Sequence, residues 1–410
     1  MSTSMTSAGK KLVIIGSSFG GVNTAYFLQH ALGKDGEITL ISREREFTFF
    51  PSLPWVIMGW RDPAQIRVDV VQPLRRRRIN FVHSDVISLD ASANEVRTEQ
   101  ARFGYDVLII ASGAELDYAA VPGLGPTAGY THSTFSIDEA ILARDALARV
   151  LAGERGRIVV GAAAGASCIG PGYEIVMMID ALLRKARRRH HFSLSFLTPE
   201  PFVGHFGIGG VGVAARLIAD EFAERDIEVM TSVKIAEAQQ DRLVLATGAE
   251  VQFDFSLVIP AFVGSGFVRS ADGLANPRGF IPVTPELRSS RFDNIYAVGV
   301  AVALPPVGST PVPVGVPKTG HLTEQMARAA AHNIASNLRG GRKVDGLDLS
   351  GTCIMDAGDT GYYISAQPFL PPRNRVIHKK GKWSRYLKLA FEKYYLARIR
   401  HDLPSLHFGW

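Results

Sequence analysis

The sequence is short of cysteine. Only two cysteines, Cys168 and Cys353, occur in 410 residues, and 185 positions separate them. A disulfide framework needs several cysteines, and a structural zinc site needs closely spaced ligand pairs such as Cys-x-x-Cys, so neither is predicted. The histidines show no His-Glu-x-x-His or other metal-ligand spacing, and we expect no metal. Each cysteine is therefore either an inert buried thiol or a reactive one.

Long apolar runs are also missing. No stretch approaches the roughly 18–20 apolar residues that a membrane-spanning helix needs. The first eleven residues, MSTSMTSAGKK, contain no apolar signal core, which predicts an N-terminus that is not cleaved for export. Hydrophobic residues make up 46% of the chain, which is ordinary for a folded protein. The length predicts two or three structural units, because single cores seldom grow beyond about 250–300 residues.

The chain carries a net charge of +6, and its basic residues cluster in a few runs. Two of these runs, Arg75–Arg78 and Arg184–His191, contain no interleaved aromatic residues on which bases would stack. We interpret them as solvated helix or loop faces and expect no nucleic-acid partner.

The first unit follows the order of a dinucleotide-binding fold. An apolar strand at 11–15 precedes a glycine-rich turn, a helix at 22–32 and a second strand at 37–42. Glycines let a pyrophosphate approach the positive helix N-terminus closely. The usual fingerprint is altered in two places, since Ser18 replaces the central glycine and Arg43 stands where an acid often binds ribose. The predicted nucleotide site comprises Gly16, Ser18, Gly20, Gly21, Ser42 and Arg43.

The same turn also fits the Gly-x-Ser-x-Gly nucleophile elbow of hydrolases, with Ser18 as nucleophile. Such an enzyme needs an acid and then a histidine in later loops. His321 and His332 both fall in a predicted helix at 321–338, and an elbow on the first strand would leave the sheet without its usual earlier strands. The nucleotide site is the favoured interpretation.

Farther along, segments 105–113 and 291–302 each end an apolar strand in a glycine turn. Between them, residues 157–264 contain their own strand–helix–strand set. We predict an α/β fold with two Rossmann-like dinucleotide-binding domains and a C-terminal amphipathic, membrane-associating tail. The first domain is discontinuous (10–115 and 266–338), the second spans 116–265 and carries Cys168, and the C-terminal region spans 339–410 and carries Cys353.

Cys168 lies in GASCIGP (165–171), where a second nucleotide-binding turn is expected. The preceding Gly161-Ala-Ala-Ala-Gly165 lacks the glycine triplet that seats a dinucleotide, so hydride donation from NAD(P)H is disfavoured. A cysteine at a helix N-terminus gains thiolate character from the helix dipole, and we expect a reactive thiol here.

Residues 378–402 hold eight Lys or Arg against two acids. We predict an amphipathic helix whose basic residues flank or oppose an apolar face. Such a helix suits the surface of an anionic membrane, although it also suits packing on the protein body. The apolar face comprises Trp383, Tyr386, Leu387, Ala390, Phe391 and Tyr394.

Several unusual stretches occur together in one order along the chain. They are FTFFPSLPWVIMGW (47–60), GASCIGPGYE (165–174), PFVGHFGIGGVG (201–212), NPRGFIPV (276–283), PPVGSTPVPVGVPKTG (305–320), CIMDAGDTGYYI (353–364) and PPRN…KKGKW…LAFEKYYLARIR (371–400). In these motifs the chain resembles the sulfide:quinone oxidoreductases over nearly its whole length.

The resemblance implies an FAD enzyme in which Cys168 and Cys353 form a redox-active disulfide beside the flavin. Sulfide attacks the disulfide, and electrons pass through FAD to a membrane quinone. It also implies a peripheral, monotopic protein on the cytoplasmic face of an anionic membrane, and leaves a homo-oligomer open.

The resemblance assigns further roles. Glu174 moves protons near the sulfurs, His205 is a general base or a pocket wall, and Lys318 stabilises negative charge on the flavin. The structural alternatives are an ion-paired carboxylate, a buried histidine and a capping lysine. Residues implied to lie against FAD are Ser112, Gly113, Gly299, Val300, Lys318 and Gly320, of which Val300 stands where many flavoproteins carry an acid.

The chain differs from the family at one notable position, because many family members carry a third cysteine where Phe135 aligns here.

Three alternative functions are also open. The flavoprotein of flavocytochrome c sulfide dehydrogenase is exported and binds flavin through an N-terminal cysteine, and this chain shows neither feature. A type II NADH:quinone oxidoreductase needs the glycine turn that is altered at 161–165. A membrane-anchored flavin sensor whose disulfide only reports thiol status is the non-catalytic alternative.

Overall fold

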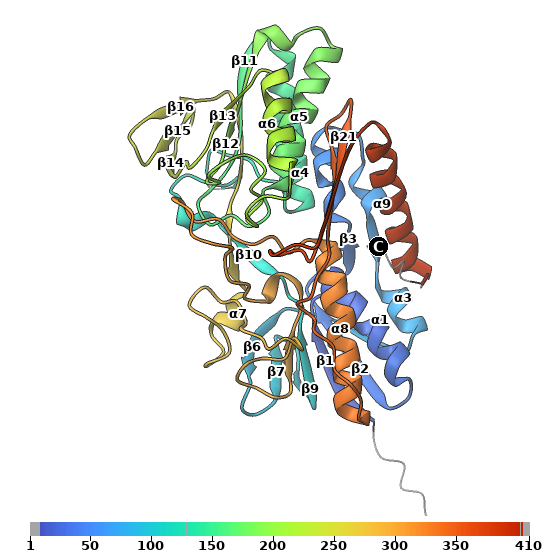
Figure 1. The fold of residues 1–410 in the computed structure, drawn as a ribbon. Helices are drawn as coiled ribbons and strands as arrows, with labels where there is room; N and C mark the ends of the chain where they lie inside the picture. The colour runs from blue at the N-terminus through green and yellow to red at the C-terminus, as the bar shows by residue number, and fades with distance from the viewer. Residues whose placement is uncertain (1–8, 128, 402, 405–410) are drawn as a thin grey trace, which may run out of the picture.

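The computed structural model describes residues 9–127, 129–401 and 403–404. It contains two parallel sheets flanked by helices and a C-terminal hairpin and helix along one edge (Figure 1). The residues on which the N-terminal export prediction rests lie mainly outside the described part of the chain, as do Asp402 and the last six residues.

The first sheet has five parallel strands in the order β19-β9-β1-β2-β5. Its apolar runs are buried on both faces, as expected for a parallel sheet. The elements are β1 (Lys10–Ile15), α1 (Phe19–Leu32), β2 (Gly36–Ser42), β5 (Asn80–His83), β9 (Val107–Ile110), β19 (Ile295–Ala297) and α8 (Gly320–Arg339). Because β19 follows the second sheet in sequence, the chain leaves this unit and returns, which confirms a discontinuous first Rossmann-like sheet. The exact domain boundaries stay a prediction.

The second sheet has four parallel strands in the order β13-β12-β11-β17. Its elements are α4 (Ile137–Ala152), β11 (Gly156–Ala162), α5 (Gly170–Lys185), β12 (Phe192–Leu197), α6 (Ala214–Glu224), β13 (Ile227–Met230) and β17 (Phe255–Ile259). Aromatic rings join this sheet to its helices. Phe196 of β12 lies 4.6 Å from Tyr173 of α5 and 5.3 Å from Phe222 of α6, measured between ring centroids.

Smaller elements complete the two units. Strand β10 follows β9, and strand β18 follows β17. The two strands pair antiparallel, so the two chain segments that connect the units lie side by side. The remaining elements are β3 (Glu46–Thr48), α2 (Leu53–Ile57), β4 (Arg67–Asp69), α3 (Val71–Arg76), β6 (Val86–Asp90), β7 (Glu95–Thr98), β8 (Arg102–Gly104), β10 (Ala114–Asp117), β14 (Ile235–Ala238), β15 (Arg242–Leu245), β16 (Glu250–Gln252), β18 (Ala261–Gly264) and α7 (Gly266–Arg269), with five short 3-10 turns at 50–52, 63–66, 118–120, 189–191 and 299–301.

The C-terminal region is an antiparallel sheet followed by one helix. The sheet order is β20 (Gly351–Asp356), β21 (Gly361–Gln367) and β22 (Arg375–Lys380), and α9 spans Trp383–His401. Figure 1 shows α9 beside the β20–β21 hairpin, at the edge of the molecule. The residues predicted at helical spacing, from Trp383 to Tyr394, lie in α9, whereas His378 to Lys380 at the start of the basic stretch pair with β21.

The inner face of α9 combines apolar residues (Tyr395, Leu396 and Ile399) with buried charges. Lys388, Glu392 and Arg398 are buried with polar partners on the body. Trp383 and Tyr386 are instead 41% and 69% exposed. The predicted apolar face of this helix is therefore divided. Trp383, Tyr386 and Ala390 are exposed, whereas Leu387, Phe391 and Tyr394 are half-buried. Within the described ranges, none of the helices is both long and apolar enough to cross a bilayer.

The aromatic contact between α5, β12 and α6 predicts a large stability effect. Phe222 is 1% exposed, so Phe222→Ala removes buried contacts and leaves a cavity, which costs about 3–5 kcal/mol of unfolding free energy. Leu217→Ala on the same helix, at a position 36% exposed, should cost below about 1 kcal/mol. Denaturant unfolding measures both, and similar losses for the two variants would contradict this packing argument.

Candidate active site around two cysteines and a glycine-rich nucleotide turn

The two cysteines approach each other because β20 docks on α5. The backbone N–H of Asp356 donates to Glu174 Oε1 at 2.7 Å. Cys353 lies three residues before Asp356, which is about 10 Å along a strand. Cys168 lies six residues before Glu174, in the turn that leads into α5. The contact therefore brings both cysteines to the same level, and their thiols interact electrostatically with each other and with Glu174.

The surroundings of these thiols favour the protonated form. Neither cysteine is in a disulfide in this structure, and both are partly buried. Burial, followed by the charge of Glu174, raises the pKa of Cys168 to about 11. Burial and Glu174 likewise raise the pKa of Cys353 to about 12, against the opposing effect of Lys388. The expectation that the helix N-terminus gives Cys168 thiolate character was wrong, because desolvation and a nearby carboxylate act the other way.

Glu174 belongs to a buried polar group that sequence reasoning only partly found. Lys388 Nζ of α9 donates to Glu174 Oε1 at 2.6 Å and lies 5.0 Å from the centre of the Trp55 ring. Trp55 Nε1 donates to Asp356 Oδ2 at 2.8 Å. Burial raises the pKa of Glu174, and Lys388 partly offsets this effect. The missed signal was the polar stripe Ser384, Lys388 and Glu392, spaced by four residues on an otherwise aromatic helix.

The turn that holds Cys168 is closed by another segment of the chain. Gly165 N–H donates to Pro313 O at 2.6 Å, and Gly315 N–H donates to Ala166 O at 3.0 Å. A Cβ on Gly315 would lie 2.7 Å from Ser167 Cβ, so the two segments touch. The N–H of Gly165, which would face a dinucleotide phosphate, is thus used within the protein.

The acid after β12 is also internal. In a dinucleotide-binding unit an acid near this place often binds the ribose. Glu200 is fully buried and accepts hydrogen bonds from Tyr173 Oη at 2.6 Å, Thr198 Oγ1 at 2.7 Å and the backbone of Phe206 at 2.6 Å. Together with the closed turn, this arrangement supports the expectation that NAD(P)H is not seated here.

His205 lies one segment away from the cysteines. Its Nδ1 accepts from the N–H of Gly207 at 3.1 Å, its ring contacts Phe202, and burial lowers its pKa. A Cβ on Gly207 would collide with the carbonyl oxygen of Gly315, the residue that packs on Ser167. Within the described part of the chain, no hydrogen bond joins His205 to either cysteine.

The N-terminus of α1 fits a pyrophosphate. Gly16 has φ +105°, and a Cβ there would collide with Ala111 O. A Cβ on Gly21 would collide with Gly16 O, so the turn requires glycine at both positions. Ser18 takes an extended conformation at the N-cap and makes no side-chain cap hydrogen bond. The first-turn amides therefore have no capping side chain, as an anion site at a helix N-terminus requires.

The other predicted nucleotide residues surround this turn. Gly20 packs on Val298, and Gly320 begins α8 against Phe19. Ser42 Oγ is hydrogen-bonded to Ser17 Oγ at 2.9 Å, whereas Arg43 is exposed and lies 4.0 Å from Glu44.

Residues after β9 and β19 flank the predicted flavin position. Gly113 has φ +74° with open space where a Cβ would stand, whereas Gly299 at φ +67° packs tightly on Thr323. Ser112 Oγ is hydrogen-bonded to Ser265 Oγ at 2.9 Å. Val300 follows in a 3-10 turn and offers no polar side chain.

Lys318 is the predicted cation of the flavin site. Its Nζ donates to Val302 O at 2.9 Å and lies 4.6 Å from the centre of the Phe280 ring. Burial, with a smaller contribution from Arg278, lowers its pKa to about 8. An ammonium with a neutral oxygen and a ring as partners suits an additional anionic partner. The glycine turn, the uncapped helix and this lysine all fit FAD.

The structure also bears on three other features considered from the sequence. Phe135 packs edge-on against Phe262, with ring centroids 5.1 Å apart. His321 and His332 both lie on α8, which gives no support to the hydrolase alternative. Among the described residues, no group of three or more His, Cys, Asp or Glu could hold a metal ion.

Comparison with known proteins places this site in a family. A profile of the pyridine nucleotide-disulphide oxidoreductases matches residues 10–170. A sulfide-quinone reductase of Aquifex aeolicus is 38% identical over 401 residues, covering 96% of this chain and 91% of the relative. The X-ray structure of the sulfide:quinone oxidoreductase from that organism superposes with a TM-score of 0.93, covering 98% of this chain and 94% of that one.

More distant relatives share the fold. A type II NADH:quinone oxidoreductase of Staphylococcus aureus is 24% identical over 393 residues, 90% of this chain and 93% of the relative. The NDH2 structure from Plasmodium falciparum has 14% identity and a TM-score of 0.73, with 96% of this chain and 98% of that chain covered. With 38% identity over nearly its full length, this chain belongs to the sulfide-quinone reductase family and is an FAD-binding oxidoreductase.

Proposed function

We propose that the protein is a sulfide:quinone oxidoreductase in which Cys168 and Cys353 form the redox-active pair. The observation that carries this proposal is the docking of β20 on α5, where the Asp356 N–H donates to Glu174 at 2.7 Å and brings both thiols to one level. Bound FAD supplies a two-electron acceptor that in turn reduces a quinone.

In the proposed reaction, hydrosulfide attacks one sulfur of the Cys168–Cys353 disulfide. The S–S bond breaks, the attacked cysteine becomes a persulfide, and the other leaves as a thiolate holding the electron pair. Burial and Glu174 disfavour a thiolate at either position, so this anion is a poor resting state and a good electron donor. Glu174, with its raised pKa, is placed to exchange protons with the sulfurs.

The segment 313–315 supports sulfide rather than a nicotinamide as electron source. It accepts the hydrogen bond of the Gly165 N–H, which a phosphate would otherwise accept, and it also donates to the carbonyl of Ala166. The buried Glu200 accepts hydrogen bonds from three internal donors. The type II NADH:quinone alternative is therefore disfavoured by the geometry of the second unit.

The outer face of α9 supports peripheral binding to a membrane, where a quinone is dissolved. Trp383 and Tyr386 are exposed, and Lys382, Lys393 and Arg400 are exposed beside them. A cationic helix with outward aromatic residues suits the headgroup layer of an anionic bilayer. The cytoplasmic side and a homo-oligomer stay predictions.

The central experiment is anaerobic mixing of the holoenzyme with sulfide while the flavin absorbance is followed. We expect bleaching by sulfide, none by NADH, and reoxidation by a soluble quinone analogue. The Cys353→Ser variant should retain bound FAD. Sulfide should reduce that FAD at least about 100-fold more slowly than in the wild type, because no disulfide can form. An unchanged rate in that variant would remove the cysteine mechanism, and bleaching by NADH would favour the type II enzyme.

The charges around the thiols predict opposite effects of two substitutions. Glu174→Gln removes a negative charge that raises both thiol pKa values, so thiolates should form at lower pH. Lys388→Met removes a positive charge that lowers the pKa of Cys353, so that thiolate should form at higher pH. Maleimide labelling of the reduced holoenzyme against pH should show midpoints displaced by about one pH unit in opposite directions. Displacement of both midpoints in the same direction would contradict this electrostatic assignment.

The membrane proposal predicts binding to vesicles that contain anionic phospholipid. Replacing Trp383 and Tyr386 together by serine should weaken cosedimentation about tenfold, because both rings lose contact with the interface. Tyr130→Ser removes another exposed aromatic residue, 52% exposed in the second unit, and should leave binding unchanged. Equal losses for the two variants would show that α9 is not the contact surface.

A further inference from the structure

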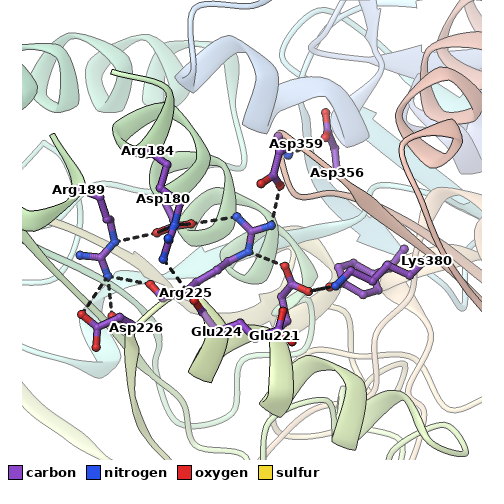
Figure 2. A network of polar contacts seen from close by, with 12 residues as sticks. Asp180, Arg184, Arg189, Glu221, Glu224, Arg225, Asp226, Asp356, Asp359 and Lys380 are labelled. Atoms are coloured by element: carbon purple, nitrogen blue, oxygen red, sulfur yellow. Dashed lines mark hydrogen bonds and ion pairs between the residues drawn. The ribbon is translucent and has the colours of Figure 1, made fainter. Parts of the chain in front are cut away.

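A buried ionic network joins α5 and α6 to the hairpin that carries Cys353 (Figure 2). At its centre is Arg225, which directly follows α6 and whose side chain is 6% exposed. Its three guanidinium nitrogens contact three carboxylates from three different elements. Nη1 donates to Asp180 of α5 at 2.9 Å, Nε to Glu221 of α6 at 2.6 Å, and Nη2 to Asp359 of the β20–β21 turn at 2.6 Å.

Each buried carboxylate in the network has other partners as well. Asp180 also accepts from Arg184 at 2.8 Å and from Arg189 at 2.7 Å. Glu221 also contacts Lys380 Nζ at 2.5 Å and accepts from the hydroxyl of Tyr362. Burial would raise the pKa of Glu221, but Lys380, Tyr362 and Arg225 outweigh it and lower that pKa. Removing Arg225 therefore leaves no buried carboxylate without a partner.

The hairpin turn is also packed tightly on α5. A Cβ on Gly358 would lie 2.7 Å from Ala181 Cβ, so the turn lies directly on the helix. Arg225 holds the adjacent Asp359, and Glu174 holds Asp356. These contacts follow α5 from Glu174 to Ala181, along the helix whose N-terminal turn carries Cys168.

We infer that Arg225 is a positioning residue for the cysteine pair. It keeps the hairpin on α5 and thereby sets the effective concentration of the Cys353 thiol at Cys168. This inference rests on the proposed function, because it concerns the equilibrium of the proposed disulfide. Because the two cysteines are 185 positions apart along the chain, only tertiary contacts such as these keep their thiols together.

The equilibrium is defined with glutathione as the redox couple. Two protein thiols and one oxidised glutathione give one protein disulfide and two reduced glutathiones, so electrons and protons balance. A looser hairpin lowers the effective concentration of the thiols and makes the disulfide easier to reduce. This equilibrium constant is a different quantity from the affinity for FAD and from the free energy of unfolding.

The experiment equilibrates the holoenzyme anaerobically in glutathione buffers of defined ratio. The reaction is then quenched, and free thiols are tagged with a maleimide and counted by mass spectrometry. Arg225→Met should lower the disulfide equilibrium constant about tenfold, which is about 30 mV toward easier reduction. Asp359→Ala, which removes only the exposed hairpin partner, should lower it about threefold.

Arg184→Met is the matched control. Arg184 contacts the same Asp180 and the carbonyl of Glu224 but not the hairpin, so its removal should leave the disulfide equilibrium unchanged. Wild-type equilibrium constants in Arg225→Met and Asp359→Ala, or an equal change in the control, would overturn the positioning role. A wild-type protein that forms no Cys168–Cys353 disulfide at any ratio would instead overturn the proposed function, and the inference with it.

Discussion

The contact between Glu174 and the backbone of Asp356 is the interaction on which the site depends. It joins a helix of the second unit to a strand of the C-terminal region, and the two cysteines come together because each lies a few residues before that contact. Lys388 neutralises the same carboxylate from α9. A buried carboxylate with a backbone donor and an ammonium is stable in a dry interior, whereas one with neither would protonate.

The same contact explains why the thiols are electrostatically unusual. A carboxylate that fixes the geometry also disfavours negative charge on both sulfurs. An isolated cysteine at a helix N-terminus would be expected to ionise more easily. In the proposed reaction, these surroundings would make the released thiolate a high-energy species that readily gives up its electron pair. Glu174 thus contributes both to the geometry of the site and, after burial, to the raised pKa values of the thiols.

Most of the architecture followed from local sequence signals. The apolar runs of β1, β9, β11 and β17 predicted buried parallel strands, and Gly16 and Gly21 predicted a turn that only glycine allows. The orientation of α9 was harder, because its aromatic residues suited both a membrane surface and packing on the body. Its inward charges depend on Glu174, Ser52 and Asn23, which are hundreds of residues away in sequence. Arg225 gave no sequence signal, because its three partners come together only in the folded chain.

The charged inner side of α9 limits how this helix can associate with lipid. Pulling it away from the body would strip Lys388, Glu392 and Arg398 of their partners and expose the matching groups on the body, which is costly for buried charges. The helix is therefore expected to stay docked and to offer the bilayer only its outward half. The helix would then enter the headgroup region by only about 5–10 Å. A hydrophobic electron acceptor would have to move out of the acyl-chain region to reach the protein.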